Sequence, residues 1–579
     1  DADFTIDQTT VQATATLVID PTFTLTIADG AGIDFTMNGT FSIEGALVLN
    51  NTATHSGMNA SNTTFVAGSE YRHLYTAAQG IIPLATWDVA STIRIAGYTN
   101  GKTLTIGSNF NQNFGDFIWD CPSQSGIISL AGLLTSTQNL TIQNTGSSTL
   151  RLSTNESPTI SVAGNLSIEG ASRVEFSTTG ANTEVTIQGD FIVNTTVGIS
   201  RFKTSGALCT VNVGGNFTMN ASGATLSLSS GAGDAIMNLT GDFDLIAGTF
   251  TESGTGQGIV NFEGSGIHTF TNTGSITGGM IYTIPASETV TAIGESIIQG
   301  GSGSSITVDG TLVVESENSS GAIITGIGAG GGNLRVTTRN FNTGSTLIYR
   351  GTGAQFLGNG QPVDTGVTTI INNASGVSLN NSSSATVTID GDVTVLNGDL
   401  TAELDNLVLN GLTTLTGGNL NLITTTATRA LTSNGIINLN GGDLTVTSGT
   451  ANATLTVNGD ITGSGAFSFS GANNNLILGG TGDLSIDFPL IAPTSLESVT
   501  VNRTGSIVFP QDLTVTSSLI TNSGTVVMNA PLNVGNDITM NGGDLVMNSS
   551  LVVVDDLNIA TGSTLFFEGQ TVELRSQYN

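Results

Sequence analysis

One nine-residue pattern recurs along this sequence and restricts the folds that it can adopt. The pattern reads apolar, any, apolar, any, turn residue, Asp/Asn/Thr, apolar, any, apolar. In the most regular stretch the turn residues are Gly164, Gly189, Gly215 and Gly241, so successive copies begin 25, 26 and 26 residues apart. Alternate residues of a strand face the same side, so the four apolar positions of each copy line one face. Short strands that recur at such a period indicate stacked β-coils, because a single coil cannot bury a face alone.

The apolar frame of this pattern extends along the chain and survives changes of the turn residue. The turn position holds glycine at first and other residues near the C-terminus: Gly39, Gly310, Gly391 and Gly459, then Gln511, Asn536 and Asp555. The apolar positions on both sides share one parity when they are counted through the turn residue. We therefore predict that the turn residue forms an inward-facing corner between two strands, and not the reversal of a hairpin.

These features predict an all-β fold, an elongated right-handed parallel β-helix or a closely related β-solenoid. Glycine accounts for 76 of the 579 residues, and Ser, Thr and Asn fill many of the others, so very little helix is expected. The alternative is a series of tandem β-sandwich domains. In that fold the strand partners would be antiparallel, and the chain would divide into units of about 100 residues.

Two stretches interrupt the pattern and suggest segment borders. Residues 65–122 hold both tryptophans and three of the six tyrosines, and residues 264–304 contain a proline and a glycine-rich run. We predict N-terminal β-solenoid coils over 1–64 and an aromatic-rich excursion or subdomain over 65–122. A regular β-solenoid of about 26-residue repeats follows over 123–290, and a second β-solenoid segment over 291–579 is expected to continue beyond the sequence.

The charge of the chain restricts its partners. The sequence has 44 acidic and 13 basic residues, a formal net charge of -31. A field of this sign repels phosphate groups, which argues against nucleic acid and anionic membranes. No apolar run approaches the roughly 20 residues of a membrane-spanning helix, so no membrane span is predicted in this segment. Neutral glycans and divalent cations are compatible with the charge.

No cofactor motif is present, and we predict no cofactor. Calcium is the one ion whose oxygen ligands the turns could supply, at Asp390 and Asp392 or at Asp555 and Asp556. Solvated turn aspartates are the preferred interpretation of these residues. The run Gly479–Asp483 resembles a calcium-binding nonapeptide of β-roll toxins, but its aspartate comes one residue too early and the run has no tandem copies.

The sequence does not favour an enzyme. His55, His73 and His268 are scattered, so no group of residues has the spacing of a zinc site. β-Helix enzymes that cut acidic polysaccharides need Lys or Arg to bind their substrate, and here 13 basic residues are spread over the whole chain. Thr-x-Thr pairs such as Thr103/Thr105, Thr386/Thr388 and Thr454/Thr456 are interpreted as solvated strand faces that do not share one repeating column.

The aromatic stretch supplies the candidate binding residues. Tyr71, Tyr75, Trp87 and Tyr98 would form a ligand or contact patch if their side chains were exposed, because aromatic rings stack on sugars and dominate contact energies. A local core is the other interpretation of the same residues, and the sequence favours it.

The sequence also resembles a known class of proteins. The segments GIIPLATWDVASTIRIAGYTN at 80–100, NFGDFIWDCPSQSGIISLAG at 113–132 and NLTIQNTGSSTLRLSTNESPTISVAGNLSIEGA at 139–171 are similar to the Gly/Asn-rich repeat regions of large secreted surface proteins of Bacteroidota. The resemblance implies export by type IX secretion and a role in adhesins, filaments or appendages. It supplies no catalytic residues, and no type IX sorting domain is recognisable after Phe567.

Taken together, the residues and the resemblance predict an extracellular structural and adhesive rod of a bacterial surface appendage or filament. Such a rod would contact other cells, surfaces or cell-surface glycans, and would assemble with identical copies through lateral or end contacts. Two alternatives are a glycan-binding surface module that uses residues 65–122 and a polysaccharide-active β-helix enzyme.

Overall fold

The computed structural model describes residues 3–179, 182–196, 198–264, 266–327, 330–362, 364–379, 386–486, 490–491, 496–567 and 569–575. These residues form short β-strands and one turn of 3-10 helix at Ile106–Ser108, and they contain no other helix. The chain divides into two compact units. Unit 1 comprises Asp1–Val290, Ile298–Ile306 and Val336–Thr338, and unit 2 comprises Thr291–Ile297, Thr307–Arg335 and Arg339–Asn579.

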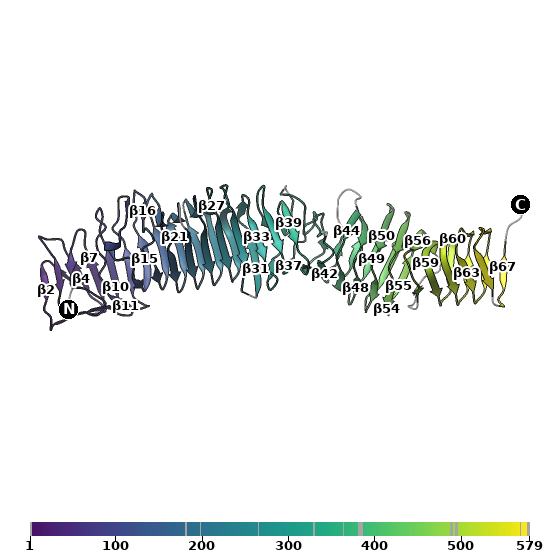
Figure 1. Ribbon diagram of the computed structural model, residues 1–579, viewed down its shortest axis with the longest axis horizontal. Coiled ribbons are helices and arrows are strands. Elements are labelled where there is room, and N and C mark those ends of the chain that lie inside the picture. The colour runs from purple at the N-terminus through teal and green to yellow at the C-terminus, as the bar shows by residue number, and fades with distance from the viewer. Residues whose placement is uncertain are drawn as a thin grey trace. The chain divides into compact units, whose positions relative to one another are not determined.

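Each unit is a parallel β-solenoid, as the sequence pattern predicts. The strands within each unit pair in parallel, coil upon coil (Figure 1). Antiparallel partners, which the tandem β-sandwich alternative requires, do not occur among the strand pairings of the described residues.

Three sets of parallel strands build the coils of unit 1. The first set holds β4 (Thr24–Ile27), β7 (Ala46–Leu49), β10 (Glu70–His73), β12 (Thr92–Ile95), β15 (Asp116–Asp120), β18 (Leu140–Asn144), β21 (Leu166–Ala171), β24 (Phe191–Thr195), β27 (Phe217–Ser229) and β29 (Phe243–Thr251). The second holds β16 (Ile128–Ser129), β19 (Leu150–Ser153), β22 (Val174–Ser177) and β25 (Ile199–Lys203), and it joins the long strand β27. The third holds β17 (Ser136–Thr137), β20 (Thr159–Val162), β23 (Thr183–Ile187), β26 (Cys209–Val213), β28 (Ala235–Leu239) and β30 (Gly258–Phe262).

The register of these strands reproduces the period of the sequence. Val185 on β23 pairs with Val211 on β26, and Phe191 on β24 pairs with Phe217 on β27, so each turn of the coil takes 26 residues. The apolar positions point inward. Along the core, the ring of Phe217 lies 5.6 Å from that of Phe191 and 5.1 Å from that of Phe243, measured between centroids. Burial of these side chains on successive coils supplies the hydrophobic stabilisation of the stack.

Residues 65–122, which the sequence suggested to be an excursion or subdomain, lie in the same ladder as the coils before them. Tyr71 on β10 pairs with Leu47 on β7 and with Ile93 on β12, and β12 pairs in turn with β15. The aromatic stretch therefore forms coils of unit 1.

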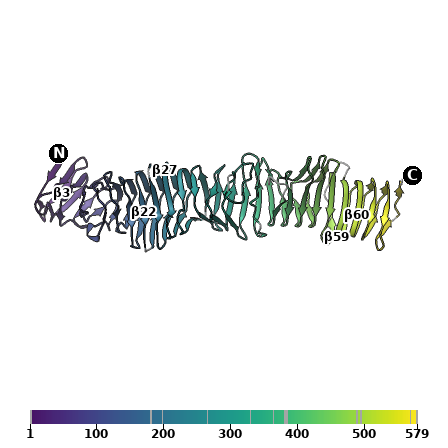
Figure 2. The ribbon, with the colours of Figure 1, turned by 90° about the horizontal axis from the view of Figure 1, so that it is seen from above.

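Unit 2 repeats the arrangement with coils of unequal length, from 19 residues between Ile538 and Leu557 to 35 residues between Thr311 and Thr346. One set of strands holds β44 (Thr386–Ile389), β47 (Asn406–Leu409), β50 (Arg429–Ser433), β53 (Ala453–Val457), β56 (Asn474–Leu478), β59 (Leu496–Phe509) and β60 (Leu513–Met528). A second holds β45 (Val393–Asn397), β48 (Thr413–Leu415), β51 (Ile437–Leu439) and β54 (Ile461–Gly463), and a third holds β46 (Leu400–Ala402), β49 (Leu420–Thr424), β52 (Leu444–Ser448) and β55 (Phe467–Ser470). The long strands β59 and β60 lie side by side near the yellow end of the ribbon (Figure 2).

The corner between β23 and β24 in unit 1 pairs a glycine with the Asp or Asn that follows it. Asp190 Oδ1 accepts the backbone N–H of Asn216 in the next coil at 2.8 Å, and Asn216 Oδ1 accepts that of Asp242 at 2.9 Å. A Cβ on Gly215 would lie 2.3 Å from Asp190 Oδ1. The corner requires glycine because the side chain of the preceding coil occupies the space that a Cβ would need. The strands on either side belong to different sheets, so the predicted corner is confirmed.

The equivalent corner of unit 2 uses the asparagine that precedes the glycine. Asn434 Nδ2 donates to Asn410 Oδ1 at 2.6 Å, and Asn458 Nδ2 donates to Asn434 Oδ1 at 2.7 Å. The glycines after them stack backbone on backbone, because a Cβ on Gly435 would lie 2.0 Å from the carbonyl oxygen of Gly411. Here the glycine makes room for main chain, and the asparagines connect the coils by their side chains.

Candidate functional site

The four aromatic residues predicted as a ligand or contact patch are buried. Tyr71 lies on β10, Trp87 on β11 (Thr86–Trp87), and Tyr75 and Tyr98 lie in the segments that follow β10 and β12. Tyr71 and Tyr98 are 0% exposed, Tyr75 is 4% exposed and Trp87 is 9% exposed. A contact patch needs exposed rings, so this prediction is wrong. The four residues form a local core, the interpretation that the sequence favoured.

Trp87 shows why the cluster cannot stack on a sugar. Its ring lies parallel to that of Phe65 with 4.0 Å between the centroids, and the ring of Phe114 meets it edge-on at 5.2 Å. Its indole N–H donates to Gln112 Oε1 at 3.2 Å. The ring is held by aromatic neighbours and its polar atom is already bonded. A hollow of about 510 Å³ lies beside its edge, lined also by Leu84 and Thr86.

His73 is the centre of a buried polar network in the same coils. Its Nδ1 lies 2.8 Å from the hydroxyl of Tyr71, and its Nε2 lies 3.0 Å from the carbonyl oxygen of Gln79 and 3.1 Å from the hydroxyl of Tyr98. Burial lowers the pKa of His73 to about 3 and raises the pKa of both tyrosines. The ring is therefore neutral at physiological pH. The ammonium group of Lys102, 4.2 Å from the centre of the Tyr98 ring, covers this network on one side.

The alternation of residues along β10 could have predicted that Tyr71 and His73 are buried. Tyr71 and His73 alternate with Glu70 and Arg72 on β10, and they pair with the buried Leu47 and Leu49 of the coil before. Residues of one parity share a face of a strand, so the two rings had to point inward with the leucines.

Two of the four aspartates considered for calcium, Asp390 and Asp392, bind protein donors, and the other two belong to a surface cluster of carboxylates. Asp390 accepts a hydrogen bond from Asn410 Nδ2, and Asp392 accepts the backbone N–H of Leu412 at 2.9 Å. Carboxylate oxygens of Asp537, Asp555 and Asp556 lie within 4.8 Å of one another on the surface of unit 2. Asp537 also accepts the backbone N–H of Asp556 at 3.1 Å, the same coil-to-coil contact that the corners of unit 1 make.

The turn at Gly479–Asp483 binds a cationic side chain of the protein, the guanidinium of Arg503. The guanidinium of Arg503, which is 1% exposed, donates to the carbonyl oxygens of Gly479 at 2.9 Å, Gly482 at 2.6 Å and Thr481 at 3.1 Å. It also donates to Gly459 O at 3.0 Å. The planar guanidinium of Arg503 therefore holds the carbonyl groups of this turn in a fixed geometry. The sequence could not reveal this contact, because Arg503 lies one coil away from the turn.

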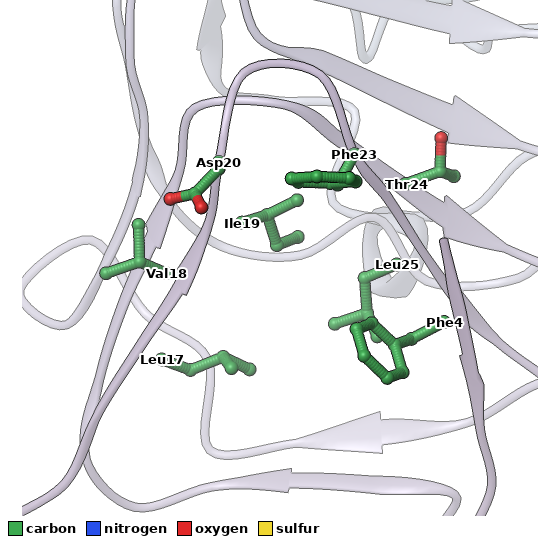
Figure 3. A pocket seen from close by; sticks show the side chains of 8 residues that line it. All are labelled: Phe4, Leu17, Val18, Ile19, Asp20, Phe23, Thr24 and Leu25. Atoms are coloured by element: carbon green, nitrogen blue, oxygen red, sulfur yellow. The ribbon is translucent and has the colours of Figure 1, made fainter. Parts of the chain in front are cut away.

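The first coil of unit 1 contains a shallow apolar hollow (Figure 3). Eight residues line its volume of about 160 Å³: Phe4, Leu17, Val18, Ile19, Asp20, Phe23, Thr24 and Leu25. Phe4 is 58% exposed and Val18 is 44% exposed. The lining is apolar apart from Asp20 and Thr24, so the hollow offers little that could orient a polar substrate.

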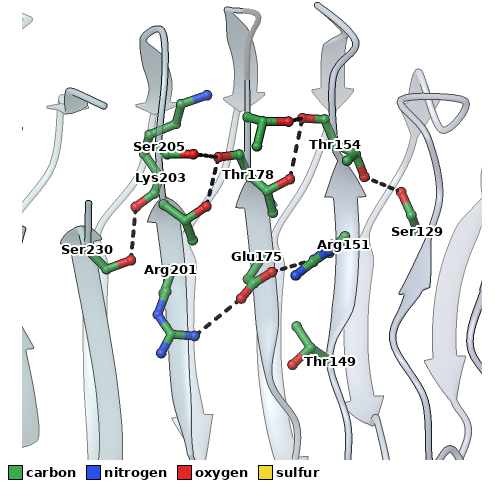
Figure 4. Close-up of polar contacts among 12 residues, drawn as sticks. Ser129, Thr149, Arg151, Thr154, Glu175, Thr178, Arg201, Lys203, Ser205 and Ser230 are labelled. Carbon is green, nitrogen blue, oxygen red and sulfur yellow. Dashed lines mark hydrogen bonds and ion pairs between the residues drawn. The ribbon is translucent and has the colours of Figure 1, made fainter. Parts of the chain in front are cut away.

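Charged side chains form ladders along the outer face of unit 1. Glu175 on β22 lies between Arg151 on β19, at 2.6 Å, and Arg201 on β25, at 3.3 Å (Figure 4). Arg94 on β12 likewise bridges Glu70 at 3.0 Å and Asp120 at 3.2 Å. Each pair connects neighbouring coils, and the partly exposed pairs of Arg94 contribute about 0.2–1 kcal/mol each.

Unit 2 presents a broad surface with almost no charge, which we call the amide-lined face. It consists of three outward columns on β44, β47, β50, β53, β56, β59 and β60. The first column holds Thr386, Asn406, Ala430, Thr454, Asn475, Ser498 and Ser518; the second holds Thr388, Val408, Thr432, Thr456, Ile477, Thr500 and Ile520; the third holds Asp390, Asn410, Asn434, Asn458, Gly479, Asn502 and Asn522.

The strand register of this face corrects one expectation from the sequence. The pairs Thr386/Thr388 and Thr454/Thr456 were not expected to share a column, but the register places them in the same two columns, three coils apart. The register depends on turn lengths that differ between coils, so the spacing in the sequence concealed the alignment.

The two cysteines take no part in a site. Cys121 and Cys209 are buried free thiols, and burial raises the pKa of both to about 12.

Comparison with known proteins found no match to this chain among protein-family models, curated proteins or solved structures. Within the described residues, the structure has no helix that is long and apolar enough to cross a membrane.

Proposed function

We propose that this chain is a stiff structural and adhesive segment of an extracellular bacterial surface appendage or filament. In this proposal it is exported by type IX secretion from a member of the Bacteroidota, in line with the resemblance of its repeats. It presents its outer faces to other cells, surfaces or surface glycans, and it associates with identical copies. Catalysis is not part of the proposal.

The observation that carries the proposal is that side-chain hydrogen bonds connect successive coils in both units, in addition to the backbone hydrogen bonds of the strand ladders. Asp190 and Asn216 bind the backbone of the following coil in unit 1, and the asparagines from Asn410 to Asn458 bind one another in unit 2. A force along the solenoid axis must break these side-chain contacts together with the strand ladders. This is the arrangement that a filament under tension requires.

The two alternatives receive less support. A glycan-binding module on residues 65–122 would use rings that are buried here, such as Tyr71 and Trp87. A polysaccharide-active enzyme would need free cationic groups for its acidic substrate, and Arg94, Arg151 and Arg201 are engaged with carboxylates.

The proposal is tested with beads coated with the purified chain. We expect such beads to adhere to bacterial cells and to solid surfaces under flow, and free monosaccharides to leave the adhesion unchanged. Beads coated with heat-unfolded chain are the control. Adhesion that one free sugar abolishes would support the glycan-binding module in its place, and release of reducing ends from a polysaccharide would support the enzyme. Beads that do not adhere would overturn the adhesive role.

A further inference from the structure

The amide-lined face carries almost no charge. Seven strands with three columns give 21 positions, and Asp390 is the one that carries a carboxylate; none carries a cation. The whole chain has a net charge of -31. Two copies that approach by faces rich in carboxylates repel each other, whereas this face can approach its own copy with little repulsion.

The face is also rigid before anything binds to it. All seven residues of its second column, from Thr388 to Ile520, are β-branched, so their first side-chain torsion is restricted. The asparagines of the third column are fixed by hydrogen bonds to one another, as between Asn434 and Asn410 and between Asn522 and Asn502. Ordering side chains on association costs about 0.5–1.5 kcal/mol for each flexible one, and most of that cost is absent here.

The repeat of the face fits a second copy of the same chain. Parallel strands lie about 4.8 Å apart, so a contact formed at one coil recurs at the next when the partner has the same repeat. Seven strands at this spacing extend over about 34 Å, and the five residues from the first column to the third extend over about 16 Å. The face then covers about 540 Å² on each copy, and a pair buries about 1,100 Å², just above the roughly 1,000 Å² of the smallest specific interfaces.

We propose that the amide-lined face is the surface through which two copies of this chain pack laterally, face to face. The inference rests on the proposed structural role and specifies its partner, a second copy. The same patch serves both copies, so the contact is symmetric and places β-branched residues of one copy against those of the other, with asparagine amides at its border. Its area makes the association weak for one pair. It becomes strong only when many copies are held together on a surface.

The test introduces like charges at the centre of the face. T432D/T456D places two carboxylates in the second column, and T432K/T456K places two ammonium groups at the same positions. Because the lysine pair makes the chain less negative, loss of association in that variant cannot come from net charge. The control is T445D/S468D, which changes paired outward positions on β52 and β55, in another sheet of the same unit. Far-UV circular dichroism and protease resistance establish that each variant is folded.

Sedimentation velocity over a range of concentrations gives the result. We expect the wild-type chain and T445D/S468D to pass from monomer to dimer, and higher salt to strengthen the dimer by screening the remaining repulsion. T432D/T456D and T432K/T456K should each lower the association constant at least tenfold. Three outcomes would overturn the inference. Both face variants could associate as strongly as wild type, the control could lose as much of its association constant as they do, or the wild-type chain could stay monomeric at every concentration. Bead adhesion that persists while association is absent would overturn this inference and leave the adhesive role in place.

Discussion

The two units build the same corner in different ways. In unit 1 the Asp or Asn after the glycine accepts a backbone N–H of the next coil, as Asp190 does from Asn216. In unit 2 the Asn before the glycine donates to one amide and accepts from another, as Asn434 does. An acceptor can be Asp or Asn, whereas a group that must both donate and accept cannot be an ionised carboxylate. One glycine-rich pattern therefore contains two different chemical requirements.

The direction of the amide ladder explains its single acidic member. Each amide N–H of the unit 2 ladder points toward the preceding coil, so the donors of Asn410, Asn434 and Asn458 all point toward Asp390. Aligned amide dipoles polarise one another and present their positive ends to the carboxylate. In unit 1 the ladder of Asn238 and Asn212 ends in the same way, with Asn212 donating to Glu184 at 3.0 Å.

The largest expected effect concerns the buried cation of unit 2. We expect R503M to destabilise unit 2 by about 3–5 kcal/mol, because it removes the hydrogen bonds that a buried guanidinium donates to four main-chain carbonyl oxygens. R429M is the matched control, since Arg429 is partly exposed and donates to Glu403 O and Thr428 O at the surface. Urea unfolding followed by proteolysis of each unit measures both variants. If both variants lose equally little free energy of unfolding, Arg503 does not stabilise the turn at Gly479.

Acid should weaken unit 1 through His73. A histidine whose pKa is lowered by folding contributes stability above its unfolded pKa, about 6.5, and loses it as the pH falls toward its folded pKa. The pKa of His73 in the folded chain is about 3. The expected loss is about 1.4 kcal/mol per pH unit within this window. Urea unfolding of wild type and H73Q at pH 7 and pH 4.5 measures the difference. A wild-type chain that loses no more stability than H73Q would contradict the buried, neutral imidazole.

Alanine at the corner glycines separates the two kinds of close contact. G435A brings a Cβ to 2.0 Å from a backbone oxygen, whereas G215A meets an Asp side chain at 2.3 Å, and that side chain can turn away after losing its hydrogen bond. Overpacking costs about 1–3 kcal/mol, and we expect G435A at the upper end and G215A at the lower end. Gly107 has no neighbour within 4 Å of its Cβ position, so G107A serves as the control. Thermal unfolding compares the three, and the reverse order would show that the backbone stack is the more adaptable corner.

The smallest expected effect tests the donor requirement directly. N165D keeps the oxygen that accepts the Asp190 backbone N–H, so we expect a change below about 0.5 kcal/mol. N434D removes the donor to Asn410 and should cost about 0.5–1.5 kcal/mol at neutral pH. Part of this cost should disappear in acid, where a protonated carboxyl can donate. If the two variants prove equally stable, the corners do not differ in the way described above.

The sequence predicted the coil more successfully than the surfaces. Four apolar positions around Gly189 and Gly215, with a constant parity and a 26-residue spacing, are sufficient to specify parallel coils with an inward apolar face. The ladders depend on the register between coils, and unequal turn lengths in unit 2 conceal it. Arg503 could not be assigned for the same reason, because its carbonyl partners belong to neighbouring coils. The aromatic composition of residues 65–122 suggested a contact patch, whereas the alternation of Tyr71 and His73 with charged residues places both rings in the core that the sequence favoured.

Pulling a single molecule by its two ends tests most directly whether stacked coils with axial ladders form a force-resisting structure. If they do, the chain should release one coil at a time. A 26-residue coil of unit 1 should lengthen the chain by about 90 Å and a 20-residue coil of unit 2 by about 70 Å, at about 3.5 Å per residue. Extension without measurable force, or release in blocks of about 100 residues, would contradict the account.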